Sequence, residues 1–186
     1  LKRLLQRAPE RRIADLPRVE VFGEGAVDAL TPIVFVPGLE GQQLEYTIDT
    51  DRSTVPNVLC AIHQKKWTIL WLQLSIMVPI YDQCFFHAFN PRLDMATMTW
   101  SNADGVDMRV FEYGDINSVA FFHIGLKEIP VYNQFIDIAY ARGYSNETLR
   151  VSQYDFRYAP TQLRDQGWFN HTKAMVEDVA ASTGQK

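Results

Sequence analysis

Apolar and polar residues alternate along the chain in blocks that predict strands and helices in turn. A β-prone run at 32–36 ends abruptly in Pro37 and Gly38, as a buried strand does at a sharp turn. The same patterns predict further elements: strands at 108–111 and 149–151, and helices at 131–143 and about 166–182. Strands that alternate with helices predict an α/β fold with a largely parallel sheet.

The helical periodicity also predicts which faces are buried. One stripe is predicted in each helix: Val131, Phe135, Ile138 and Ala139 in the first, and Trp168, Thr172, Met175, Val176 and Val179 in the second. Gly184 is placed to end the second helix. Residues 38–57 and 90–107 are interpreted as loops, with turn signals at Asn90-Pro91 and Asp104-Gly105 in the latter.

A continuous apolar run covers residues 67–80 and is too short to span a bilayer. If it is a helix, Trp67 and Trp71 lie on one face with Leu74 and Val78. A helix that is apolar all round is either buried or in contact with lipid. A core helix is the simpler interpretation, whereas the paired Trp residues favour a membrane interface.

Composition limits the class of protein. The chain has 186 residues, of which 47% are apolar and 22% charged, so one folded domain is expected rather than disorder. The net charge of −4 argues against a nucleic-acid partner.

The first twelve residues are basic, which indicates a frayed terminus or, alternatively, a surface-binding arm. Because the chain starts with Leu and shows no signal-peptide pattern, we expect its N-terminus to be incomplete.

Cys60 and Cys84 are the two cysteines, and they flank the apolar run. Isolated cysteines can be inert buried thiols. A disulfide is favoured because no other cysteine competes for pairing and because a bridge would close an exposed apolar loop. Two glycosylation sequons, Asn146-Glu147-Thr148 and Asn170-His171-Thr172, also indicate an oxidising compartment. We therefore expect the disulfide, with glycosylation at Asn146 and Asn170.

The Gly-rich turn after the first predicted strand is the strongest candidate for chemistry. Ligands of α/β enzymes bind beyond the carboxyl ends of strands, and Gly lets backbone N–H groups approach them closely, as an oxyanion hole requires. Asp155 and Arg157 are expected to form a structural charge pair. The four histidines lack metal-ligand spacing and are expected to be surface or packing residues.

Several motifs occur in a fixed order along the chain. They are Val36-Pro37-Gly38 followed by Gly41, Gln43, Leu44 and Glu45; Cys60 with Cys84; Thr68-Ile69-Leu70-Trp71-Leu72; Asp104-Gly105-Val106-Asp107-Met108-Arg109-Val110; and Gly143-Tyr144, Arg150, Tyr154-Asp155-Phe156-Arg157 and Ala159-Pro160. Over about residues 30–186 this order resembles the lecithin:cholesterol acyltransferase and lysosomal phospholipase A2 family of α/β-hydrolases. The third motif has one residue more than the family's Thr-Ile-Trp-Leu, and Phe156 and Gln42 replace the family's Trp and Asn.

The resemblance implies a role for Glu40. In the family, a backbone N–H of this loop holds the acyl oxyanion, and the matching position here is Glu40. The family commonly has Leu there after a small or polar residue, whereas this chain has Leu39-Glu40. A carboxylate at this position repels an oxyanion unless it points away or is protonated. The alternative is a plain turn with one buried and one solvated side chain.

The resemblance also assigns the disulfide-clipped loop, about residues 57–90, to lipid contact. The two cysteines have the spacing of the family's lid disulfide, and Trp71 matches a family Trp near the acyl-binding side of the lid. The lipid-contact residues are therefore predicted to be Trp67, Ile69, Leu70 and Trp71. The expected partners are a phospholipid acyl donor and a membrane or lipoprotein surface, with neither nucleic acid, cofactor nor metal.

The sequence contains no Gly-x-Ser-x-Gly elbow, which carries the nucleophile of an α/β-hydrolase. In the family, the strand leading to that elbow begins just after the position of Gln185-Lys186. We therefore expect an N-terminal extension at 1–30 and, at 31–186, the N-terminal portion of an α/β-hydrolase fold with a disulfide-clipped membrane-contact subdomain. The catalytic Ser, Asp and His then lie beyond the chain, which alone is inactive and keeps an open hydrophobic sheet edge.

The expected function of the parent protein is that of a lipid O-acyltransferase or phospholipase. Such an enzyme forms a Ser acyl-enzyme from a phospholipid acyl ester and transfers the acyl group to water or to a lipid alcohol. Two alternatives stay open: a non-catalytic lipid-binding or interaction protein derived from the same fold, and an unrelated esterase of that fold. The expected location is luminal, either lysosomal or secreted.

Overall fold

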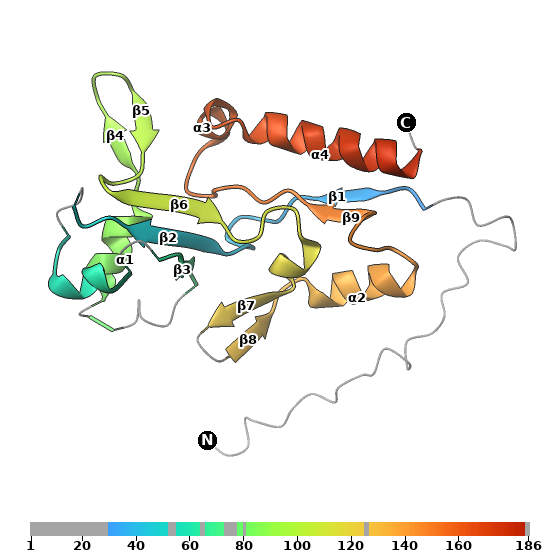
Figure 1. Ribbon diagram of the computed structural model, residues 1–186, viewed down its shortest axis with the longest axis horizontal. Coiled ribbons are helices and arrows are strands. Elements are labelled where there is room, and N and C mark those ends of the chain that lie inside the picture. The colour runs from blue at the N-terminus through green and yellow to red at the C-terminus, as the bar shows by residue number, and fades with distance from the viewer. Residues whose placement is uncertain are drawn as a thin grey trace, which may run out of the picture.

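Four small sheets, rather than one continuous sheet, form the framework of the protein in the computed structural model (Figure 1). The structure describes residues 30–51, 55–63, 66–72, 78–79, 81–124 and 127–184. The predicted extension at 1–30, with its basic residues, lies outside the described residues except for Leu30.

A parallel pair of strands lies between two helices, as predicted for an α/β fold. Strand β1 (Ile33–Phe35) pairs with β9 (Leu149–Val151). Helix α2 (Asn133–Ala141) covers one face of this pair and helix α4 (Trp168–Thr183) lies on the other (Figure 1). A short helix, α3 (Pro160–Asp165), precedes α4. The core on the α2 side contains Ile116, Val119, Ala120, Ile136, Ala139, Leu149 and Val151.

A three-stranded antiparallel sheet forms the second part of the molecule. Its order is β3 (Thr68–Trp71), β2 (Leu44–Ile48), β6 (Val106–Val110), and every residue of the central β2 is buried. Helix α1 (Asp82–Phe89) and a 3-10 helix (Val58–His63) contribute residues to the core of this sheet. Its core contains Tyr46, Ile48, Cys60, Leu70, Cys84, Ala88, Ala103 and Val106.

The pairing of β3 with β2 shifts by one residue. Thr68 and Ile69 lie opposite Tyr46 and Glu45, but Leu44 lies opposite Trp71. Leu70 is therefore the extra residue of a β-bulge, which lets one strand carry one residue more than its partner.

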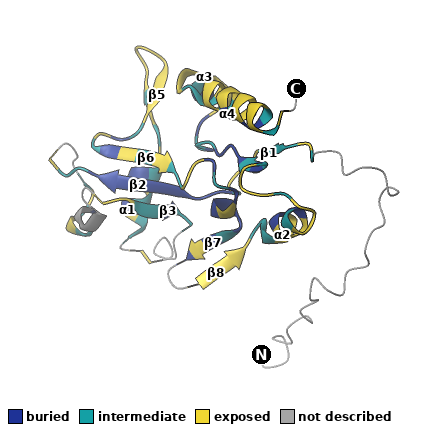
Figure 2. Ribbon diagram, turned by 45° about the vertical axis from the view of Figure 1, so that its right-hand side comes forward, coloured by how far each residue is buried: buried dark blue, intermediate teal, exposed yellow. Residues whose placement is uncertain are grey.

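Two hairpins and a second 3-10 helix, Ile116–Val119, complete the described elements. One joins β4 (Arg92–Asp94) to β5 (Thr99–Ser101), and the other joins β7 (Phe121–Ile124) to β8 (Lys127–Pro130). Strands β5 and β8 are exposed along their length (Figure 2). None of the described helices is both long and apolar enough to cross a membrane.

Several sequence predictions are confirmed. The strands at 32–36, 108–111 and 149–151 correspond to β1, β6 and β9, and the two predicted helices correspond to α2 and α4. Gly184 ends α4 in the left-handed conformation, as predicted. The Asp104-Gly105 turn also forms, with Gly105 at a φ of 73°.

Other predictions are wrong. The run at 67–80 is not a helix at its start, since 68–71 form β3; residues 73–77 and 80 lie outside the described residues. The predicted loops contain β2 and the β4–β5 hairpin. Of the described strands, only β1 and β9 pair in parallel, so the sheet is not largely parallel.

The predicted helix faces are only partly correct. In α2 the buried residues are Ile136 and Ala139, whereas Phe135 is 38% exposed and Ile138 is 42% exposed. In α4, Met175 and Val179 are buried as predicted, but Val176 is exposed. Both helices therefore bury a narrower stripe than their apolar residues suggest.

The predicted disulfide between Cys60 and Cys84 is present, with a Cα–Cα distance of 5.2 Å. It joins the 3-10 helix to α1 beside the buried Leu70 and Ala88. The bond closes a loop with a sequence separation of 24 residues. Loops of this length lose considerable chain entropy in the unfolded state when they are closed.

We predict that removing the disulfide lowers the free energy of unfolding by about 3 kcal/mol. The variant with Cys60→Ala and Cys84→Ala should lose this stability in urea unfolding without reductant. The wild-type protein under reducing conditions is the matched control and should unfold at a similar urea concentration. Equal midpoints for the oxidised wild type and the double variant would contradict the prediction.

Candidate functional site

The loop at residues 36–43 follows the carboxyl end of β1 and is the candidate functional site. The Gly41 N–H donates to the Gly38 carbonyl at 3.0 Å, which closes a tight turn. Glu40 has a φ of 61°, a conformation that costs a non-glycine residue about 1 kcal/mol or more. The side chains of Leu39, 70% exposed, and Glu40 both lie at the surface, so the alternative of one buried and one solvated side chain is wrong.

The two ends of the Glu40 backbone differ in their hydrogen bonds. Its carbonyl accepts a hydrogen bond from the indole Nε1 of Trp71 at 3.1 Å. Its N–H donates to no other residue in the described part of the chain. Trp71 of β3 thus holds the Glu40–Gly41 peptide group through its carbonyl, while the N–H of the preceding Leu39–Glu40 peptide group has no partner among the described residues.

Tyr132, at the start of α2, fixes the first half of the loop. The Gly38 N–H donates to the Tyr132 hydroxyl at 3.0 Å, and the Tyr132 ring contacts the Phe35 ring edge-on with 4.9 Å between centroids. The Gly38 amide is therefore already used. A Cβ at Gly41 would lie 2.3 Å from the Tyr132 hydroxyl oxygen, whereas a Cβ at Gly38 would lie at 3.4 Å. Only Gly fits at position 41 beside this hydroxyl.

Two buried glutamines hold the second half of the loop. Gln42 Nε2 donates to the Tyr154 carbonyl, and Gln42 Oε1 is buried and accepts no hydrogen bond from the described residues. The Gln43 amide accepts from the His123 N–H at 3.2 Å and donates to the His123 carbonyl at 3.3 Å. Gln43 therefore binds β7 as a neighbouring strand would.

The four predicted lipid-contact residues do not share one surface. Leu70 is 1% exposed and packs in the core, so it does not reach a lipid surface in this conformation. Trp67 is 38% exposed and stacks on the Arg109 guanidinium at 4.1 Å. Ile69 and Trp71 are half-buried, and Trp71 packs against Phe89 and Phe156 as well as holding Glu40.

Asp155 and Arg157 form the structural pair that the sequence predicts. The Arg157 side chain is 1% exposed and makes two hydrogen bonds to Asp155, Nε–Oδ1 at 2.8 Å and Nη2–Oδ2 at 2.6 Å. Nη2 also donates to Asn102 Oδ1, and Nη1 donates to the carbonyls of Ala88 and Phe89. These bonds use every donor of the guanidinium, which leaves none for a substrate.

Burial shifts the pKa of two tyrosines near this region. It raises the pKa of Tyr154, with the neighbouring Tyr132 as a second cause. It also raises the pKa of Tyr158, whose hydroxyl donates to Asn102 Oδ1 at 3.2 Å. Both shifts favour the protonated phenol.

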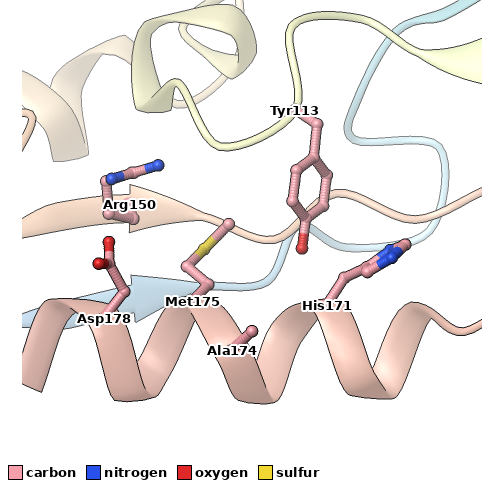
Figure 3. Close-up of a pocket in the computed structure, with 6 residues that line it drawn as sticks. All are labelled: Tyr113, Arg150, His171, Ala174, Met175 and Asp178. Carbon is pink, nitrogen blue, oxygen red and sulfur yellow. The ribbon is translucent and has the colours of Figure 1, made fainter.

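A separate hollow of about 460 Å³ lies between α4 and the start of β9 (Figure 3). Its lining includes Tyr113, Arg150, His171 and Asp178. Arg150 donates through Nε to the Gly114 carbonyl at 3.0 Å, and the Tyr113 hydroxyl lies 3.3 Å from Ser152 Oγ. Among the described residues no three His, Cys, Asp or Glu side chains are grouped to hold a metal ion.

Sequence reasoning missed Tyr132 and the role of the Trp71 indole. Tyr132 lies 94 positions from Gly38, and no motif connects the two. The neighbouring residues Gln42 and Gln43 are a local sign that could have been used. A buried Gln needs several hydrogen-bond partners, so the pair is consistent with contacts to other backbone segments.

Comparisons with known proteins place these features in a wider context. The family model for lecithin:cholesterol acyltransferase matches residues 67–186. The chain is 29% identical over 153 residues to the lysosomal phospholipase A and acyltransferase of the dog, covering 80% of this chain and 36% of that protein. It is 28% identical over 158 residues to the rat phosphatidylcholine-sterol acyltransferase, covering 83% of this chain and 34% of that protein. The chain thus spans about a third of the length of these relatives.

We predict that Gly41→Ala destabilises the protein by about 1–3 kcal/mol, because the new methyl group meets the Tyr132 hydroxyl. Thermal unfolding measures the effect. Gly38→Ala is the matched control in the same loop and should change stability little, since its Cβ makes an ordinary contact. Tyr132→Phe should recover part of the loss in the Gly41→Ala background. Equal stability of the two single Ala variants would contradict the prediction.

We also predict that Arg157→Met lowers the free energy of unfolding by about 3–5 kcal/mol, because it leaves the mostly buried Asp155 carboxylate unpaired. Arg164→Met is the control, since the Arg164–Asp165 pair has both side chains more than half exposed. Its loss should be below about 1 kcal/mol. Urea unfolding of both variants measures the two losses of stability. Similar losses would contradict the prediction that burial makes the Arg157 pair more important than the Arg164 pair.

Proposed function

The chain belongs to the lecithin:cholesterol acyltransferase family, and from this premise we propose that it is the oxyanion-loop portion of a lipid acyltransferase or phospholipase. The observation that carries the proposal is the hydrogen bonding of the Glu40 backbone. Its N–H is free of partners among the described residues, while its carbonyl, in the next peptide group, is held by Trp71 just beyond the carboxyl end of a parallel strand. A preorganised donor of this kind stabilises the negative oxygen that forms when an ester carbonyl is attacked.

The proposed chemistry is acyl transfer through a Ser acyl-enzyme. A Ser hydroxyl attacks the acyl carbonyl of a phospholipid, and the Glu40 N–H donates to the oxygen as it becomes negative. The acyl group then passes to water or to a lipid alcohol. We propose that the exposed Glu40 side chain points away from that oxygen, because a nearby carboxylate would destabilise the negative charge that forms on it.

The unpaired edge of β1 supports a position for the nucleophile beside Glu40. β1 pairs with β9 on one edge, and no described strand pairs with its other edge. A strand that follows α4 and lies parallel to that edge would make the usual right-handed crossover. Its carboxyl end would then lie beside Glu40, where an elbow Ser has to be.

We propose a lipid surface as the partner of the region around β3. Its support is the half-exposed Trp67, the half-buried Ile69 and Trp71, and the disulfide that closes the segment. Tryptophan suits the boundary between headgroups and acyl chains. The disulfide supports an oxidising location, either lysosomal or secreted, and the relative from the dog is named as lysosomal.

The complete protein that contains this chain tests the proposal. It should release fatty acid from phosphatidylcholine vesicles, or transfer the acyl group to an added lipid alcohol, and a fluorophosphonate should label its Ser and stop both reactions. Vesicle binding without labelling or turnover would overturn the enzymatic proposal in favour of a non-catalytic lipid-binding protein.

In that complete enzyme we predict that Trp71→Phe lowers kcat about 2- to 10-fold, which is the effect of losing one hydrogen bond. Phe keeps an aromatic ring but cannot donate to the Glu40 carbonyl. Trp100→Phe is the matched control, because Trp100 is an exposed residue of β5 outside the proposed lipid-contact region, and it should leave kcat unchanged. Equal kcat values for the two variants would rule out a positioning role for the Trp71 indole.

A further inference from the structure

The two Asn-x-Thr sequons lie in different structural settings. Asn146 is exposed and lies in the turn at 146–148 that leads from α2 into β9. Asn170 is exposed too, but it is the third residue of the 16-residue helix α4. N-linked glycosylation needs both the Asn amide and the hydroxyl two positions later, so the setting of the whole triplet matters.

The Asn146 side chain is oriented with its amide nitrogen free. Its Oδ1 accepts hydrogen bonds from the Tyr140 hydroxyl and, at 3.4 Å, from Asn117 Nδ2. Its Nδ2 donates to no residue in the described ranges. A glycan is attached through Nδ2 and leaves Oδ1 as an acceptor, so both contacts can persist in the glycosylated protein.

The hydroxyl of the same sequon stays within the turn. Thr148 Oγ1 accepts from the Ser145 N–H at 2.9 Å and donates to the Ser145 carbonyl at 3.4 Å. Both partners are backbone groups of Ser145, an exposed residue three positions earlier. The turn therefore presents the amide and the hydroxyl of its sequon at one surface.

The second sequon is divided between two sides of α4. Thr172 Oγ1 donates to the Trp168 carbonyl at 3.0 Å and lies 2.6 Å from Oγ of the buried Ser152. In a helix, residues two positions apart do not face each other. Once α4 has formed, Asn170 faces solvent while the hydroxyl it requires faces the interior.

We propose that the protein carries an N-linked oligosaccharide on Asn146 and none on Asn170. The donor is an oligosaccharide joined to a lipid through a diphosphate. Asn146 Nδ2 bonds to C1 of the first sugar, the bond from C1 to the diphosphate oxygen breaks, and the lipid diphosphate leaves with that electron pair. The amide loses one proton. The Cys60–Cys84 disulfide independently indicates the oxidising compartment in which this transfer takes place.

The glycan would lie near the starts of the two parallel strands, at the end opposite to the candidate site. Asn146 precedes the start of β9, where Leu149 lies opposite Ile33 at the start of β1. The loop with Glu40 follows the other end of β1. The proposal therefore does not depend on the proposed enzymatic function, and either can fail alone.

Translation of the full chain behind a heterologous signal sequence, in the presence of rough microsomes, tests the proposal. Protease-protected chains should show one endoglycosidase-sensitive mass increase, and peptide mapping of the wild type should place it on Asn146. Asn146→Gln and Thr148→Ala should abolish it. Thr148→Ser keeps the sequon and is the matched control, and Asn170→Gln is the second control; both should retain one glycan.

The readout does not require any variant to fold, because the wild-type peptide map alone identifies the site. Protected chains without a glycan, a glycan on Asn170 alone, or glycans on both residues would each overturn the proposal.

Discussion

Hydrogen bonds from side-chain amides to backbone groups hold the separate sheets of this protein together. Its sheets are small, so many buried N–H and C=O groups at their borders have no neighbouring strand. Gln43 takes the place of a strand beside His123, and Gln153 accepts from the Gly114 N–H while donating to the carbonyls of Phe111 and Glu112. Each buried Gln offers a donor and an acceptor in one plane, as a peptide group does. Without them these partly buried backbone groups would lose a protein partner.

The candidate site lies where these connections converge. Its loop contacts β3 through Trp71, α2 through Tyr132 and the segment after β9 through Gln42. The segment after β9 also carries Arg157, whose bonds to the end of α1 join the disulfide-bonded region to the parallel strands. The backbone geometry at Glu40 is therefore set by three distant parts of the chain, which is how a strained φ can persist there.

The sequence predicts those elements that depend on residues close together in the chain. Examples are the end of β1 before Pro37-Gly38, the end of α4 at Gly184 and the strand at 149–151. The central strand β2 lies in a segment predicted as loop. Its polar residue Glu45 is paired across the sheet with Arg109, which lies 64 positions away, so no local pattern indicates the contact. The disulfide and the position of Glu40 were accessible through spacing and resemblance. The contacts that orient the site were not, since they join residues tens of positions apart.

The bulge in β3 bears on how the candidate site tolerates a change of length. Thr68 lies opposite Tyr46 and Trp71 lies opposite Leu44, so two residues of β3 stand between positions that a single residue of β2 separates. The extra residue is absorbed inside the strand and is not passed along the chain. A strand can thus be one residue longer than its partner while the Trp71 indole stays beside the loop and donates to the Glu40 carbonyl.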